Sequence, residues 1–196
     1  MKTVKNILHI IDSVEPGGAE GVFIELILRL DKSKYNPVVT IPEAGWLSGE
    51  LDKQGIDYHI LPAKGSFSFK YLIGIFRLIR SNNIDLVQSH LFGSNFYASL
   101  AGFVSRTPVV SVFHGAVDIS DSDKMLWLKS MLINLGSKKV IAVSESLTKN
   151  IQARTQINAG LLATIYNGVD TKRFKPSKND ELRNRYSLSS SATLVC

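Results

Sequence analysis

Short apolar runs alternate with amphipathic stretches along most of the chain, and this alternation limits the fold more than any other feature. The first run, residues 6–12, is almost unbroken in its apolar character, as expected of a strand covered on both faces. Because helical stretches separate the strands, we expect the strands to pair in parallel, with helices crossing over both faces of the sheet. The sequence therefore predicts an α/β fold built on a doubly wound parallel sheet.

The same pattern gives the expected order of elements. Strands are predicted at residues 6–12, 37–41, 57–61, 85–90, 107–113, 140–143 and 161–166, and helices at residues 19–30, 46–54, 69–80, 93–104, 124–135, 144–154 and 180–186. Residues 171–177 have the composition of a linker, and residues 192–196 begin another strand. We therefore expect one domain over residues 1–170, followed over residues 171–196 by a linker and the first part of a second domain.

Charge and cysteine content restrict the environment. The 23 basic and 17 acidic residues give a net charge of +6, which suits an anionic ligand or the anionic inner face of a membrane. The single cysteine, Cys196, excludes an intrachain disulfide, so a cytoplasmic location fits. No apolar run approaches the roughly 18–20 residues that span a bilayer, and the short run after the N-terminus is unlike a secretory signal. No nucleic-acid partner is predicted.

The turn after the first predicted strand contains two adjacent glycines, Gly17 and Gly18. Glycines between a buried strand and a helix let backbone N–H groups approach a ligand closely, and the helix N-terminus adds partial positive charge. The turn therefore suits a phosphate. A tight strand-to-helix turn that binds nothing explains the same residues, because an adjacent glycine pair is a weak motif.

Two histidines lie at the ends of predicted strands. His90 ends the fourth strand, and His114 follows the fifth and precedes Gly115. Ligands of open parallel sheets bind outside the carboxyl ends of the strands, so we expect both histidines to share one edge with the glycine turn. Ser144, after the sixth strand, suits a helix N-cap, and its place at this edge also suits a ligand contact.

The helix predicted at residues 69–80 is basic on one face and apolar on another. Lys70, Arg77 and Arg80 form the basic face. A helix of this kind can lie on anionic lipid. A core helix with a solvated basic face is the alternative interpretation, and the sequence leaves both open.

Four motifs in order carry a resemblance to a known family. They are residues 16–20 (PGGAE), 112–115 (VFHG), 140–146 (VIAVSES) and 165–170 (IYNGVD) with Phe174 and Pro176. Together they resemble the amino-terminal, acceptor-side half of a retaining glycosyltransferase of the GT-B fold, family 4. The resemblance implies a Rossmann-like domain of an enzyme that transfers a sugar from a nucleotide-sugar to a glycan or lipid-linked acceptor. It also implies polysaccharide or glycolipid synthesis at the cytoplasmic membrane face, with no metal ion or other cofactor.

The resemblance implies roles for the matching positions. Gly17 and Gly18 would approach the donor diphosphate and sugar, and His114 would act at the reaction centre. The residues expected to line the cleft are His90, Gly115, Ser144 and Glu145, and those expected to mark the interdomain hinge are Asn167 and Gly168. In this family a second domain holds most of the nucleotide, so the chain alone is expected to be inactive.

Two other classes of function remain open on the sequence. A dinucleotide-dependent oxidoreductase would use an acid such as Glu43, after the second strand, to bind a ribose. The first turn lacks the G-x-G-x-x-G spacing of such enzymes, which counts against them. A non-catalytic sugar- or lipid-binding module is the other class, and it rests on the basic face of residues 69–80.

Overall fold

The computed structural model describes residues 4–63, 67–116, 119, 123–175 and 181–189. The chain forms two compact units, Met1–Tyr166 and Asn167–Cys196. In the second unit, the backbone N–H groups of Lys172 and Arg173 donate to the Asp170 carboxylate, and α7 (Glu181–Arg185) is a short helix. The strand predicted at residues 192–196 lies outside the described residues, as do Pro176 and Cys196.

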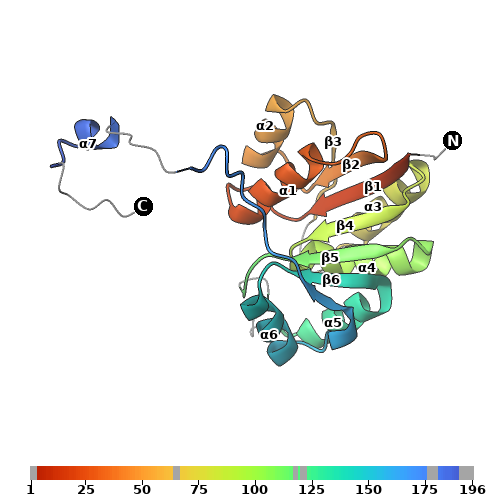
Figure 1. The fold of residues 1–196 in the computed structure, drawn as a ribbon. Coiled ribbons are helices and arrows are strands. Elements are labelled where there is room, and N and C mark those ends of the chain that lie inside the picture. Colours follow the sequence, from red (N-terminus) through yellow and green to blue (C-terminus); the bar gives the residue numbers. More distant parts are fainter. Residues whose placement is uncertain (1–3, 64–66, 117–118, 120–122, 176–180, 190–196) are drawn as a thin grey trace. The chain divides into compact units, whose positions relative to one another are not determined.

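The first unit contains a seven-stranded sheet in the order β3-β2-β1-β4-β5-β6-β7 (Figure 1). All six neighbouring pairs are parallel, and each predicted strand is present with its ends within three residues of the expected ones. The doubly wound parallel sheet is therefore confirmed. The strands are β1 (Lys5–Ile11), β2 (Tyr35–Ile41), β3 (Tyr58–Ile60), β4 (Leu86–His90), β5 (Val109–Phe113), β6 (Ser137–Ala142) and β7 (Leu162–Thr164).

Helices cover both faces of the sheet. Leu8 and Ile10 of β1 pack into a cluster with α3 and α4, whereas Ile11 packs into a second cluster with α1 and α2. This division follows the two-residue period of a strand. The helices of this unit are α1 (Gly18–Leu28), α2 (Trp46–Lys53), α3 (Phe69–Ser81), α4 (Phe92–Ser105), α5 (Leu126–Gly136) and α6 (Glu145–Arg154), with a short 3-10 turn, η2 (Ala159–Leu161), before β7.

The last residue of α5 is fixed by its contact with α4. A Cβ atom on Gly136 would overlap the backbone carbonyl oxygen of Ser99, so only glycine allows this approach. Just beyond it, the buried hydroxyl of Ser137 lies 2.8 Å from those of Ser99 and Ser111. The small residues Ser99 and Gly136 thus allow the backbones of α4 and α5 to come close together.

One buried histidine lies within the core of β1. His9 is fully buried, and its ring meets Phe23 of α1 edge-on, with 6.3 Å between ring centroids. Neither ring nitrogen has a hydrogen-bond partner in the described part of the chain. Burial disfavours the charged imidazolium and lowers the pKa of His9 to about 4. The folded protein therefore keeps His9 neutral.

The close approach of α5 and α4 predicts a difference between two helical glycines. We expect Gly136→Ala to lower the free energy of unfolding by about 1–3 kcal/mol, because the new methyl group meets a backbone oxygen. Gly49→Ala in α2 is the control, since no atom lies within contact of its Cβ position, and it should raise stability by about 0.5–1 kcal/mol. Urea unfolding measures both, and equal effects would contradict the contact.

The buried state of His9 predicts how stability depends on pH. Between its unfolded pKa near 6.5 and its folded pKa of about 4, the unfolded chain binds a proton that the folded chain does not. Stability should therefore fall as the pH is lowered through this window, with His9 contributing about 2–3 kcal/mol of the loss by pH 4.5. In urea unfolding at a series of pH values, His9→Leu should reduce the acid-induced fall in the free energy of unfolding by this amount. The same change at exposed His59 should not.

Candidate functional site

Three neighbouring strands bring the predicted site residues to one edge of the sheet. β1 pairs with both β2 and β4, so the order of the strands reverses beside β1. Ile11 pairs with His90, and His90 pairs with Val112, two residues before His114. The turn after β1, the end of β4 and the end of β5 are therefore adjacent. This is the place where open α/β sheets bind ligands.

The helix after the glycine turn begins without a side-chain cap. Gly17 is the N-cap of α1 and, lacking a side chain, makes no side-chain cap hydrogen bond. The Cβ position of Gly18 faces open space, whereas a Cβ atom on Gly17 would overlap the carboxylate of Glu20, which is itself buried. Free backbone N–H groups and the helix dipole make such a helix start receptive to an anion.

Three other helix starts in this unit receive side-chain hydrogen bonds from the protein itself. Ser68 and Ser144 accept hydrogen bonds at the starts of α3 and α6, and the Asp12 carboxylate accepts one from Ser94 N–H in the first turn of α4, at 2.9 Å. The N-capping interpretation of Ser144 is thereby confirmed. Its neighbour Glu145 is exposed in the first turn of α6, and a ligand contact for either residue stays a prediction.

The two predicted histidines contact one another directly. Nδ1 of His90 lies 2.8 Å from Nε2 of His114, and the rings stack with centroids 5.1 Å apart. His90 has 0 % of its surface exposed, and Phe23 of α1 packs edge-on against its ring. Burial lowers the pKa of His90 well below its ordinary value, and the nearby imidazoles of His114 and His9 lower it further. His90 is therefore a neutral, buried group behind His114.

His114 and Gly115 are both partly exposed at the end of β5. Nε2 of His114 is engaged with His90, and Nδ1 is also withdrawn from solvent. The imidazole thus belongs to the wall of the site, with neither ring nitrogen facing water.

A buried hydrogen-bond network joins the strand ends that carry the two histidines. The Asn95 side chain donates to the carbonyl of Val112 at 3.0 Å and accepts from the hydroxyl of Ser89 at 2.7 Å. It therefore connects β4 to β5 one residue before His90 and two residues before His114. Sequence reasoning missed Asn95, because an asparagine in the first turn of a helix gives no signal that it bridges two strands.

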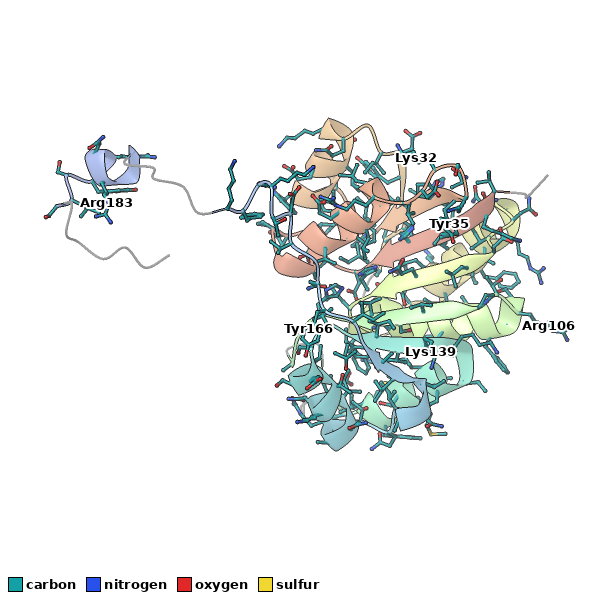
Figure 2. All side chains as sticks on the ribbon, in the orientation of Figure 1. Lys32, Tyr35, Arg106, Lys139, Tyr166 and Arg183 are labelled. Atoms are coloured by element: carbon teal, nitrogen blue, oxygen red, sulfur yellow. The ribbon has the colours of Figure 1, made fainter. Side chains whose placement is uncertain are left out.

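A separate hollow lies at the same edge, over the ends of β1, β2 and β3. It measures about 490 Å³, and three carboxylate residues, Asp12, Glu15 and Glu43, are among those that line it. Of the residues singled out from the sequence, Glu43 lines this hollow, whereas the glycine turn and the two histidines do not. A hollow of about 540 Å³ at the opposite, amino-terminal edge is lined in part by Lys32 and Tyr35, which Figure 2 labels.

Two kinds of feature are absent from the described residues. No group of three or more His, Cys, Asp and Glu side chains in this part of the chain is arranged to hold a metal ion. No helix in the same residues is both long and apolar enough to cross a bilayer. Asn167 and Gly168 are exposed at the start of the second unit.

Solved structures share this fold at low sequence identity. Anabaena HepE in complex with UDP-glucose matches with a TM-score of 0.77 and 22% identity, over 93% of this chain and 50% of that one. A glycosyltransferase from Rickettsia africae matches with a TM-score of 0.75 and 23% identity, over 96% and 51%. The lipopolysaccharide outer core galactosyltransferase WaaB matches with a TM-score of 0.66 and 21% identity, over 90% and 50%. The chain thus spans about half the length of these proteins.

The family itself is identified from the sequence. A search of curated proteins finds no match. The model of Glycosyltransferase Family 4 matches residues 16–173, a region that contains the glycine turn, both paired histidines and Ser144. Because this region covers most of the sequence, the chain belongs to Glycosyltransferase Family 4.

Proposed function

We propose that this chain is the acceptor-side domain of a retaining glycosyltransferase that transfers a sugar from a nucleotide-sugar. Its family and the UDP-glucose complex of the similar HepE structure support a nucleotide-sugar donor. Because the chain spans half the length of its structural relatives, we further propose that a second domain completes the donor site. Residues 171–196 would connect the two, with Asn167 and Gly168 at the hinge, and the isolated chain would be inactive.

The observation that carries this proposal is the uncapped start of α1 beside the His90–His114 pair. The backbone N–H groups after Gly17 would hold the donor diphosphate, because preorganised donors stabilise the charge that develops on a leaving phosphate. His114, bonded to His90 at 2.8 Å, would lie against the transferred sugar. This arrangement needs no metal ion or other cofactor, since amide groups supply the positive potential.

The acidic hollow suits the acceptor. Carboxylates only accept hydrogen bonds, and the hydroxyl groups of a glycan donate them, so Asp12, Glu15 and Glu43 would bind a sugar acceptor and repel a diphosphate. Gly115, Ser144 and Glu145 would complete the cleft on the β5 and β6 side. The product would be a surface polysaccharide or a glycolipid. The oxidoreductase alternative, which rested on Glu43, loses its support to the family match.

The outer face of α3 suits a membrane surface that presents a lipid-linked acceptor. Phe69 and Ile73 are 69% and 46% exposed, and Arg77 and Arg80 are also exposed. Their spacing of three and four residues places all four on one face of the helix. Apolar side chains next to basic ones are typical of helices that lie on anionic lipid. The enzyme would therefore work in the cytoplasm, in contact with the inner face of the membrane.

The proposed donor site predicts the activity of the longer protein that contains this chain. In a screen of nucleotide-sugar donors, His114→Ala should lower turnover by about 100-fold, while His59→Ala, an exposed change on β3, should not. The anomeric configuration of the product, read by NMR, should be that of the donor. Full activity of His114→Ala would remove the catalytic role. Turnover by residues 1–196 alone would contradict the need for a second domain.

The proposed membrane contact predicts a charge effect specific to α3. Arg77→Glu with Arg80→Glu should weaken binding to phosphatidylglycerol vesicles about 30-fold, since each basic residue near an anionic surface contributes about 1 kcal/mol. Lys32→Glu with Lys138→Glu is the control, because both residues are exposed elsewhere and the net charge falls equally. Vesicle sedimentation measures both. Equal losses would mean that only net charge matters, and unchanged binding would remove the contact.

A further inference from the structure

The start of α1 carries a carboxylate as well as backbone N–H groups. Glu20 is the third residue of α1 and the acidic residue of its first turn, and only 6% of its surface is exposed. The atoms nearest to the Cβ position of Gly17 belong to the carboxyl group of Glu20, so this side chain folds back over the N-cap. The start of α1 therefore already holds one negative charge from the protein itself.

No other side chain compensates this charge directly. In the part of the chain that the structure describes, Glu20 makes no ion pair and no hydrogen bond. Burying a carboxylate without a partner costs free energy unless a positive potential lies nearby. The N-terminal end of the α1 dipole supplies that potential, which acts within the first turn of a helix. Glu20 thus uses the potential that would otherwise attract an external anion.

The two glycines of the turn differ in what their missing side chains allow. Gly17 has φ −162 and ψ 172, an extended conformation that any residue adopts, so its lack of a side chain serves to make room for Glu20. Gly18 is the first residue of α1, and nothing lies within 4 Å of its Cβ position. Gly18 therefore leaves the approach to the helix open to a ligand, next to the same carboxylate.

We propose that Glu20 is a specificity-determining residue that lowers the affinity of the α1 start for highly charged phosphates. This inference rests on the proposed function, in which the N–H groups after Gly17 hold a diphosphate. A carboxylate at the same helix end repels that group, and the repulsion grows with the charge of the ligand.

This charge effect distinguishes the donor from the product. The terminal phosphate of a nucleoside diphosphate ionises a second time near neutral pH, whereas in a nucleotide-sugar the corresponding oxygen is esterified. The nucleotide that remains after sugar transfer is therefore the more highly charged of the two. Glu20 favours the donor over this nucleotide and promotes its release.

Simple anions test the effect without knowledge of the donor. The probes are inorganic pyrophosphate and its diester with one methyl group on each phosphate, which lacks the additional ionisable oxygens. In a ¹H–¹⁵N spectrum of the ¹⁵N-labelled chain, the amide signals of Gly17 and Gly18 report binding at the start of α1. Titration of each probe at about pH 8 gives its dissociation constant.

Three variants separate charge from packing. Glu20→Gln removes the charge at constant size and should strengthen binding about tenfold for pyrophosphate and about fourfold for the diester, because the lost repulsion scales with ligand charge. Glu25→Gln, the matched control, removes a charge from the exposed face of the same helix, where Glu25 pairs with Arg29. It should change either affinity by less than about twofold. Glu20→Asp keeps the charge and should bind both probes as the wild type does.

The possible results separate this inference from the proposed function. Glu20→Gln should fold, since a neutral group of the same size replaces an unpaired, buried carboxylate. Equal affinities of the wild type and Glu20→Gln, equal gains for both probes, or equal gains in Glu20→Gln and Glu20→Asp would overturn the inference and leave the phosphate site in place. Unshifted Gly17 and Gly18 signals in Glu20→Gln would contradict both the inference and the donor site at α1.

Discussion

The pairing of β1 with β4 is the constraint on which the candidate site depends. β1 and β4 are separated in sequence by two strands and three helices, and they meet because the chain first builds outward to β3 and then returns past β1. The return brings His90 into register with Ile11 and places α1 and α4 at adjacent strand ends. The glycine turn and the histidine pair therefore share an edge through backbone pairing, before any side chain contributes.

Behind this edge the protein places polar groups in its core, where they cost stability unless they are satisfied. Asn95 and Ser89 satisfy one another and hold β4 against β5. The imidazole of His9 has no such partner and remains buried and neutral. A neutral group is tolerable in an apolar core, whereas a charged one is not. Burial keeps His9 and His90 neutral beneath the site. The folded protein therefore loses stability in acid, because the unfolded chain binds protons there that the folded chain does not.

The sheet could be predicted from the sequence, because each strand that is covered on both faces is a short apolar run. Such a run can be recognised without knowing its tertiary contacts. It was also sufficient to place His90 and His114 at strand ends. It could not show that His90 is buried behind His114, since both follow apolar runs and look alike in sequence. Nor could it find Asn95, the carboxylate of Asp12 at the start of α4, or the positive φ of 71° at Leu91, the N-cap of α4. Each of these depends on a partner far away in the chain.

Charge divides the carboxyl edge into two regions with opposite preferences. The start of α1 presents partial positive charge and free N–H groups, and the hollow over β1 to β3 presents three carboxylates. At ordinary salt such charges act over about 10 Å, so a ligand in the site experiences both. A diphosphate is attracted to α1 and repelled from the hollow, whereas a neutral, hydroxyl-rich molecule is favoured in the hollow. Under the proposed function, this division of charge would orient a sugar donor relative to its acceptor.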